Sequence, residues 1–259
     1  FPLYLYEPEC ERDKVGDGDS GSNRSQTSLF KDEGEHAPDN STAQAALQYT
    51  RTDAITDEGM EHFHSAYPDE ALGNEDVFYY VYGLLHSPDY RERYADNLSK
   101  ELPRIPCVKT AADFWAFSQA GRKLADLHVN YETVTPFPAT VNGDTGSLIP
   151  AQYRVEKMKF GKQGKEKDRS TIHYNALITV SGIPLEAYDY VVNGKSAIDW
   201  VMERQGFKKD KDSGIVNDAN DWAVETMGNP RYPLELLLRV ITVSLETTKI
   251  VKNLPNLSI

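Results

Sequence analysis

Apolar side chains recur every three to four residues between residues 75 and 131, which is the spacing of one face of an α-helix. The pattern predicts three helices: one capped by Asn74, one beginning at Ser87, and one opened by Thr110 and ending near Tyr131. Two prolines in the segment LPRIP separate the second helix from the third, because proline cannot continue a helix. We expect this block to bury the following side chains: Leu84, Leu85, Phe114, Phe117 and Leu124.

The pattern changes in the second half of the chain. Residues 153–160 and 171–180 are rich in alternating, β-branched and aromatic positions, which predicts a β-hairpin over 153–180 with a long basic loop. The dipeptide Asn193-Gly194 is typical of a tight turn, because both positions tolerate a positive φ.

A final helix is predicted from Pro233 to a point before Pro255. Its leucine and isoleucine residues follow the i, i+3, i+4, i+7 spacing, and Leu236, Val240 and Val243 add a second apolar face. We therefore expect this helix to be buried on two sides. The stretch before it, residues 207–232, shows no periodicity and is predicted to be a loop.

The N-terminal part of the chain differs from the rest. Residues 1–6 read as a short strand, whereas the acidic stretch 7–54 has few large apolar side chains and is expected to be largely mobile. The whole pattern predicts an α+β fold, in which a helical block is followed by a β-hairpin or sheet region and a buried C-terminal helix. Three parts are expected: an N-terminal part over 1–66, a helical support block over 67–135 and an α/β part over 136–259.

Charge is unevenly distributed along the 259 residues, whose formal net charge is -12. Residues 1–66 carry 14 acidic and 5 basic side chains, whereas residues 154–169 carry seven basic and three acidic ones. An acidic protein is not typical of a free-standing nucleic-acid binder, but one basic face can lie on an acidic body. The basic stretch is therefore the best chemical feature of the sequence.

A β-hairpin with this charge can enter the major groove of DNA. Lysines are suited to phosphates as flexible point charges, and Arg154 and Arg169 are suited to guanine edges, which a guanidinium contacts with two hydrogen bonds. The alternative is a solvated hairpin tip, in which these two arginines pair with Glu156 and Asp168. The candidate DNA-contacting residues are Arg154, Lys157, Lys159, Lys162, Lys165, Lys167, Arg169 and Lys195.

Motifs of catalysis and of metal binding are missing from the sequence. It has no phosphate-binding G-x-x-x-x-G-K-[ST] loop, no C-x-x-C or H-E-x-x-H metal spacing and no G-x-S-x-G elbow. Asp218 and Asp221 lack the order of a calcium loop and are expected to cap a turn. We expect a chain without catalytic residues, metal ligands or bound cofactor.

The compartment can be judged from the same sequence. Two cysteines, Cys10 and Cys107, are too few for a disulfide framework, which indicates an intracellular setting. There is no apolar run long enough to cross a membrane. The chain begins at Phe1 instead of methionine, so we expect it to be part of a longer protein.

Several longer segments follow one another in a specific order: NEDVFYYVYGLLHSPDYRERYADNL, LPRIP, FWAFSQAGRKLADLHVNYE, KMKF, TIHYNALITVSGIP, EAYDYVVNGKSAIDWV, DKDSGIVNDANDW and LLLRVITVSLETTKIVKNLP. This order resembles the C-terminal region of type ISP restriction–modification enzymes, over roughly residues 1–6 and 55–255.

The resemblance implies sequence-specific recognition of double-stranded DNA by residues 136–259. In that family, a nuclease, a helicase or translocase and an adenine-N6 methyltransferase lie upstream in the same chain. Those parts would use S-adenosylmethionine, ATP and Mg²⁺, would be the partners of this domain and would act in the cytoplasm. The competing hypothesis is a structural coupler or protein-interaction domain that docks the methyltransferase.

Overall fold

The computed structural model describes residues 2–8 and 49–259, which divide into two units, 1–59 and 60–259. The first unit is an antiparallel hairpin of β1 (Tyr4–Pro8) and β2 (Tyr49–Asp53), with the guanidinium of Arg51 4.2 Å from the ring centroid of Tyr4. β1 confirms the predicted N-terminal strand. β2 is a strand within the stretch that was expected to be mobile, and residues 9–48 of that stretch lie outside the described residues.

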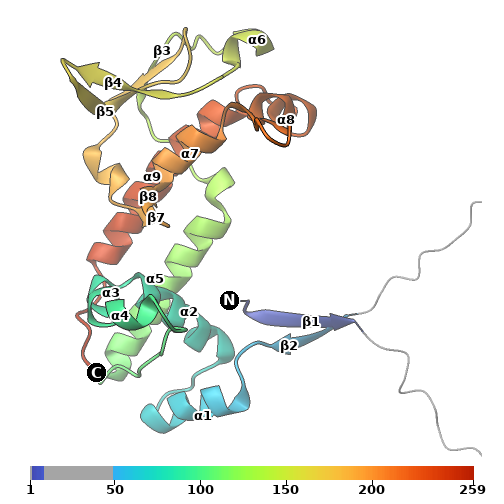
Figure 1. The fold of residues 1–259 in the computed structure, drawn as a ribbon. Helices are drawn as coiled ribbons and strands as arrows, with labels where there is room; N and C mark the ends of the chain where they lie inside the picture. The colour runs from blue at the N-terminus through green and yellow to red at the C-terminus, as the bar shows by residue number, and fades with distance from the viewer. Residues whose placement is uncertain (1, 9–48) are drawn as a thin grey trace, which may run out of the picture. The chain divides into compact units, whose positions relative to one another are not determined.

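A block of helices follows, whose first helix starts in the last residues of the first unit and whose other helices belong to the second (Figure 1). They are α1 (Asp57–Ala66), α2 (Asn74–His86), α3 (Pro88–Arg93), α4 (Ala95–Leu98) and α5 (Ala111–Val129). Ser87 and Thr110 cap α3 and α5 as predicted, each accepting a hydrogen bond from the backbone N–H three residues on. Two details of the prediction are wrong: Gly73 instead of Asn74 is the N-cap of α2, and the second predicted helix breaks at Tyr94.

The core of this block confirms four of the five predicted residues. Leu84, Phe114, Phe117 and Leu124 are fully buried. The prediction for Leu85 is wrong: it is only half-buried, because the inner face of α2 is centred on Val77, Tyr80 and Leu84 and the next position lies at its edge.

Three tyrosines fasten the proline-containing connector between α4 and α5. The hydroxyl groups of Tyr67, Tyr80 and Tyr90 donate to backbone carbonyls of residues 108, 106 and 104 at 2.7, 2.6 and 2.7 Å. These bonds satisfy carbonyls of a segment that forms no regular secondary structure, and they hold it against the aromatic core.

Helices α2 and α5 touch each other through their backbones at two glycines. A Cβ placed on Gly83 would lie 2.2 Å from the carbonyl oxygen of Phe117, and one placed on Gly121 would lie 1.8 Å from that of Tyr79. Ser118 and Arg122 flank the contact with bonds to the carbonyl oxygen and the carboxylate of Asp76. Close approach of the helices therefore requires glycine at both positions.

The rest of the second unit is mixed α and β. An antiparallel sheet has the strand order β3 (Thr140–Asn142), β6 (Thr179–Ser181), β5 (Glu166–His173), β4 (Lys159–Gln163). The shorter elements are η2 (Tyr131–Thr133), α6 (Pro150–Tyr153), η3 (Leu185–Tyr188), β7 (Val191–Val192), β8 (Lys195–Ser196), α7 (Ala197–Arg204), β9 (Phe207–Lys209), β10 (Val216–Asp218) and α8 (Ala219–Glu225). The expected turn at Asn193 and Gly194 joins β7 to β8, with φ of 49° and 80°.

Two sequence predictions are corrected in this region. Residues 153–160 are not a continuous strand, because Pro150 starts the helical turn α6 and β4 begins only at Lys159. Residues 207–232 are not simply a loop, since they contain β9, β10 and α8.

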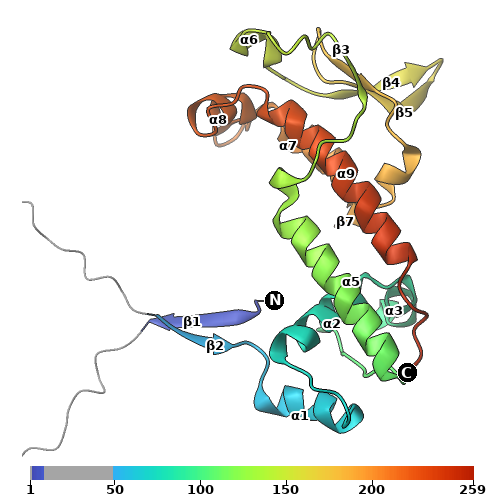
Figure 2. The ribbon, with the colours of Figure 1, turned by 180° about the vertical axis from the view of Figure 1, so that it is seen from behind.

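The long helix α9 (Tyr232–Lys252) is the centre of this unit. Figures 1 and 2 show the sheet above its N-terminal half and α5 alongside its C-terminal half. Leu234, Leu237 and Ile241 are fully buried, and Leu236 and Val240 are buried on the second face. The prediction of a C-terminal helix buried on two sides is confirmed, and the fold is α+β as expected.

Candidate nucleic-acid interface

The β4–β5 hairpin carries most of the predicted DNA-contacting side chains. Its strands are joined by the two-residue turn Gly164–Lys165, in which Gly164 has a φ of 65°. Glycine enters this left-handed region without steric cost. The predicted long basic loop is therefore wrong, because its residues continue the two strands into a tight hairpin.

Three lysines meet at the tip of the hairpin. Lys162 is the direct cross-strand partner of Lys167, and Lys165 lies in the turn between them. All three side chains are exposed. Like charges directly opposite each other destabilise a strand pair, so an anion bound here would relieve their repulsion. The charge at the tip is suited to binding an anion and contributes nothing favourable to folding.

Two further lysines extend this positive surface toward the root of the hairpin. Lys157 and Lys159 line an open groove of about 650 Å³, together with His173 at the end of β5. Within the described chain, none of the five hairpin lysines, 157, 159, 162, 165 and 167, forms an ion pair with a carboxylate. Their ammonium groups are therefore available to phosphates.

Arg169 is held at the root of the hairpin by aromatic rings. Its guanidinium carbon lies 5.3 Å from the ring centroid of Phe160 and 4.7 Å from that of Tyr188. It also forms an ion pair with Asp199 at 3.4 Å. The pairing with Asp168 that the alternative hypothesis expects is not present, because Asp168 accepts hydrogen bonds from the N–H and hydroxyl of Ser170.

Lys195 lies apart from the hairpin tip, beside α7. Its ammonium group is paired with Glu203 and lies 4.7 Å from the ring centroid of Trp200. Lys195 and Arg169 line the same small groove of about 490 Å³, together with the carboxylates of Asp199 and Glu203. The positive charges of Lys195 and Arg169 are thus partly neutralised by these carboxylates.

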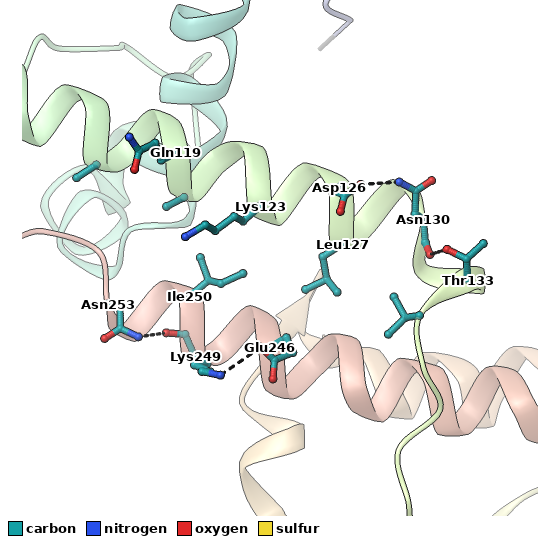
Figure 3. Close-up of a pocket in the computed structure, with 13 residues that line it drawn as sticks. Gln119, Lys123, Asp126, Leu127, Asn130, Thr133, Glu246, Lys249, Ile250 and Asn253 are labelled. Carbon is teal, nitrogen blue, oxygen red and sulfur yellow. Dashed lines mark hydrogen bonds and ion pairs between the residues drawn. The ribbon is translucent and has the colours of Figure 1, made fainter.

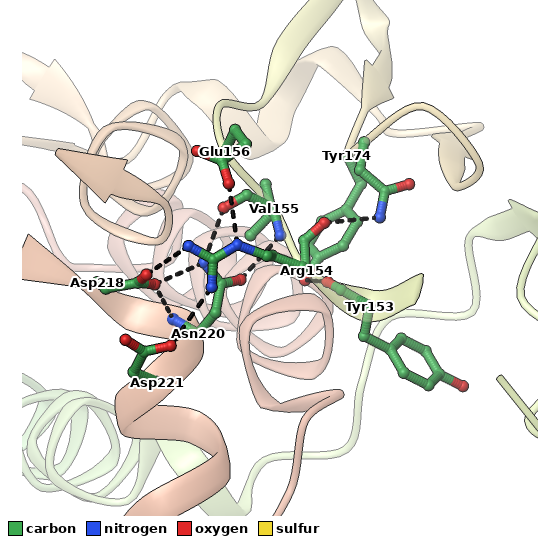
Figure 4. Close-up of polar contacts among 9 residues, drawn as sticks. Tyr153, Arg154, Val155, Glu156, Tyr174, Asp218, Asn220 and Asp221 are labelled. Carbon is green, nitrogen blue, oxygen red and sulfur yellow. Dashed lines mark hydrogen bonds and ion pairs between the residues drawn. The ribbon is translucent and has the colours of Figure 1, made fainter. Parts of the chain in front are cut away.

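Arg154 is surrounded by carboxylates (Figure 4). Its Nε donates to Glu156 at 2.9 Å, its Nη2 to Asp218 at 2.6 Å and its Nη1 to Asp221 at 3.3 Å. Each nitrogen of the guanidinium therefore has a partner, two of them about 65 residues away in the sequence. The arrangement fixes the direction of this side chain.

Asp218 is the buried member of this cluster, with a side chain only 6% exposed. Burial alone would raise the pKa of Asp218, but hydrogen bonds from Asn220 and Arg154 outweigh it and hold the pKa below its usual value. Asp218 also accepts from the N–H of Asn220 and is the N-cap of α8, so the expected capping role is confirmed. The carboxylate that Arg154 contacts is consequently ionised at neutral pH.

Asn220 adds a second connection between the same two segments. Its side-chain carbonyl accepts from the N–H of Val155 at 2.8 Å, and its amide donates to the carbonyl of Val155 at 2.9 Å. The side chain is buried, so both bonds are shielded from water. Residues 154–156, which lead into β4, are therefore fastened to the start of α8.

A second, smaller hairpin was missed in the sequence. β9 and β10 place Lys208 directly opposite Asn217. The signal was present in the cluster Lys208, Lys209, Lys211 and in the turn-forming segment DKDSG, but the flanking strands are too short for a period of two to be recognised.

Another open groove, of about 730 Å³, lies between α5 and α9 (Figure 3). Its polar lining groups bond to one another: Asn130 donates to Asp126 at 2.7 Å, and Lys249 pairs with Glu246 at 3.5 Å. No nucleophile is paired with a base among the described residues that line it.

Two other kinds of feature are absent from residues 2–8 and 49–259. No three metal-ligating side chains come together there. Similarly, none of the helices in these ranges has the length and apolar character needed to span a bilayer.

Residues 1–236 match the protein family described as the Type ISP C-terminal specificity domain. Comparison with curated proteins gives no match.

Several solved structures are similar to the chain. The ATP-dependent Type ISP restriction-modification enzyme LlaBIII bound to DNA has 34% identity and a TM-score of 0.72, covering 100% of this chain and 14% of that one. A nuclease-deletion mutant of the Type ISP enzyme LlaGI, in complex with a DNA substrate mimic, has 42% identity and a TM-score of 0.64, covering 81% and 17%. A DrdV–DNA complex has 31% identity and a TM-score of 0.67, covering 81% and 20%. The chain thus spans no more than a fifth of each of these proteins.

Proposed function

The chain belongs to the Type ISP C-terminal specificity domain family, and from that premise we propose that it recognises a target sequence in double-stranded DNA on behalf of a longer restriction–modification enzyme. The observation that carries the proposal is the set of exposed, unpaired lysines on the β4–β5 hairpin. The names of the similar structures state that those proteins are bound to DNA or to a DNA mimic, which supports the same conclusion.

The lysines suit the phosphate part of such an interface. Contacts to phosphates supply most of the sequence-independent affinity of DNA-binding proteins, because each one releases condensed counterions. A flexible ammonium group can follow a phosphate without demanding one geometry. The formal net charge of -12 does not oppose this role, since the domain would cover only part of the duplex with one basic face.

Catalysis would reside in other parts of the longer enzyme. We propose that S-adenosylmethionine, ATP and Mg²⁺ bind upstream, in the methyltransferase, helicase and nuclease parts that would be partners of this domain in the cytoplasm. The sequence has no phosphate-binding G-x-x-x-x-G-K-[ST] loop, and the described residues include no group of three or more His, Cys, Asp or Glu side chains that could hold a metal ion.

Isothermal calorimetry of the 259-residue chain tests this division of roles. We expect no saturable heat with S-adenosylmethionine or with ATP and Mg²⁺ at micromolar to millimolar ligand. Saturable binding of either cofactor with micromolar affinity would place a cofactor site in this chain and contradict the proposal.

Reversing the charge at the hairpin tip tests DNA recognition itself. In the longer enzyme that carries this domain, Lys162→Glu, Lys165→Glu and Lys167→Glu together should weaken binding to every duplex, on the order of 100-fold at about 0.1 M salt. The slope of log K against log salt should become shallower by about three, because three phosphate contacts are lost. Fluorescence anisotropy with labelled duplexes over a salt series gives both quantities.

A matched control makes the same change in net charge elsewhere. Lys100, Lys109 and Lys123 are exposed on the helical block and form no ion pair in the described chain, so reversing these three should leave the slope unchanged. Equal losses in the two triple variants would mean that only net charge matters, and an unaffected hairpin variant would remove the basis of the proposal.

A further inference from the structure

The β9–β10 hairpin has the features of a reader of base edges. Lys208 and Asn217 are cross-strand partners and therefore lie on one face of the two-stranded ribbon. Both are exposed, and neither side chain has a hydrogen bond or ion pair within the described residues. Ile215, two residues before Asn217, is 60% exposed, and Val216, on the opposite face of the strand from Asn217, is 51% exposed, although both are apolar.

The tip of this hairpin is preformed by its own polar groups. The carboxylate of Asp210 accepts hydrogen bonds from the N–H groups of Asp212 and Ser213 at 3.1 and 2.8 Å and from the Ser213 hydroxyl at 2.9 Å. These bonds, those of Ser213 first, hold the pKa of Asp210 below its usual value. Of the two acidic side chains at the tip, the carboxylate of Asp210 is therefore occupied in the turn, whereas Asp212 is exposed and contributes its backbone N–H.

The root of the hairpin is rigidly attached to the segment that leads into β4. The N–H of Phe207 donates to the carbonyl of Glu156 at 3.1 Å, and a Cβ on Gly206 would lie only 2.8 Å from that carbonyl oxygen. At the other strand, Asp218 receives the guanidinium of Arg154, and Asn220 bonds both backbone groups of Val155. Both strands of the small hairpin are thus tied to residues 154–156.

The side chains of the β4–β5 and β9–β10 hairpins suit different parts of a DNA duplex. The β4–β5 hairpin places three exposed lysines at its tip, two of them directly opposite each other, which suits phosphates. The β9–β10 hairpin places a lysine directly opposite an amide and also exposes aliphatic groups on a narrow ribbon. A two-stranded ribbon fits the major groove, where lysine can contact guanine, asparagine can pair with adenine and aliphatic groups can touch the thymine methyl.

We propose that the β9–β10 hairpin enters the major groove and reads bases through Lys208 and Asn217, while Arg154 acts as a positioning residue that fixes this hairpin relative to the phosphate-binding lysines. The inference rests on the proposed function, because it needs the domain to bind DNA. The expected ligand of the exposed face of the β9–β10 hairpin is duplex DNA, because this hairpin is attached to residues 154–156 at the root of the lysine-rich β4–β5 hairpin.

The methylated motif in host DNA tests the assignment in the longer enzyme. Asn217→Ala and Lys208→Ala should each relax the motif at one base pair, with a loss of preference of about 5- to 150-fold there. Sequencing that detects N6-methyladenine across the genome measures the motif. Asn97→Ala, at an exposed asparagine of α4, is the matched control and should leave the motif unchanged.

Combining Arg154→Ala with the hairpin variants shows whether Arg154 positions the β9–β10 hairpin or contacts a base itself. If it positions the hairpin, Arg154→Ala should relax the two base pairs that Lys208→Ala and Asn217→Ala relax singly, and adding Arg154→Ala to both of those changes should cause little further loss. If it reads a base itself, a third base pair should relax and the effects should multiply. Asp218→Asn, which leaves Arg154 in place but weakens its main ion pair, should resemble Arg154→Ala, and circular dichroism verifies that each variant is folded.

Failure of the inference can be told apart from failure of the proposed function. If Lys208→Ala, Asn217→Ala and their double variant are folded and methylate an unchanged motif, the small hairpin is not the reader. If reversal of the β4–β5 lysines also leaves DNA binding unchanged, the proposed DNA interface itself is wrong. Loss of binding in the lysine variant with an unchanged motif in the β9–β10 variants overturns the base-reading assignment alone.

Discussion

Replacing Gly121 with alanine should lower the free energy of unfolding of the chain by about 3 kcal/mol or more. The new Cβ would lie 1.8 Å from the carbonyl oxygen of Tyr79 and 2.8 Å from the nitrogen of Gly83, so α2 and α5 would have to move apart. Atoms of the backbone cannot turn away as a side chain can, and the separation would loosen the aromatic core between the two helices. Urea denaturation followed by circular dichroism measures the loss.

Gly59 in α1 provides the control for this prediction. A Cβ there would meet only the side chains of Ile55 and Thr56, at 3.3 and 3.4 Å. Because alanine is the better helix former by about 1 kcal/mol, Gly59→Ala should be neutral or slightly stabilising. If Gly121→Ala were as stable as Gly59→Ala, the backbone contact between α2 and α5 would not exist in solution.

The helical half of the fold could be predicted because its signals are local. Ser87 and Thr110 bond to N–H groups three residues away, and the apolar stripes of α5 and α9 repeat within each helix. Such features depend on neighbours in the sequence and are visible without knowledge of tertiary contacts. Leu85 was one of the exceptions, since only the placement of α2 against its neighbours decides which residues at the edge of its apolar stripe are buried.

The half of the fold that contains the sheet was harder to predict, because the same local pattern of buried residues arises there from different structures. Tyr153 and Val155 are both buried, as alternate residues of a strand would be, yet Tyr153 ends a helical turn and Val155 lies in a connector. The hairpin tip has both faces in water, so no alternation of apolar and polar residues marks its strands. The tip was consequently mistaken for a loop.

The environment of Arg154 shows why candidate site residues are the least predictable part. Its charge and position in a basic stretch suggested a base contact, and only its partner Glu156 is close in the sequence. Asp218 and Asp221 are more than sixty residues away, and their approach depends on how β10 and α8 fold back. No spacing in the sequence predicts contacts between residues that far apart. The lysines of the β4–β5 hairpin could be predicted as exposed charges because that prediction does not depend on a distant partner.

Lowering the pH from 6.5 to 4 should reduce the stability of the second unit through His128. This ring lies among α2, α5 and α9: its Nδ1 is hydrogen-bonded to the Tyr82 hydroxyl at 2.8 Å and its Nε2 to the Thr247 hydroxyl at 2.8 Å. It also stacks on Tyr190, with ring centroids 5.2 Å apart, and lies 5.6 Å from the ring of His86. The neutral ring donates at one nitrogen and accepts at the other, whereas the doubly protonated ring can only donate and would lose the hydrogen bond that it accepts.

Burial, and next the nearby His86, lower the pKa of His128 from 6.5 to about 4. Between these two values the unfolded chain binds a proton that the folded chain does not, so this contribution is complete above pH 6.5 and is lost as the pH falls toward 4. The difference corresponds to a loss on the order of 3 kcal/mol over that window.

His128→Gln keeps one donor and one acceptor but cannot titrate, so the free energy of unfolding of this variant in urea should fall less steeply with decreasing pH. The exposed residue His62 provides the control, since His62→Gln should retain the steep wild-type profile. Parallel profiles for wild type and His128→Gln would show that His128 is not held neutral by this cluster.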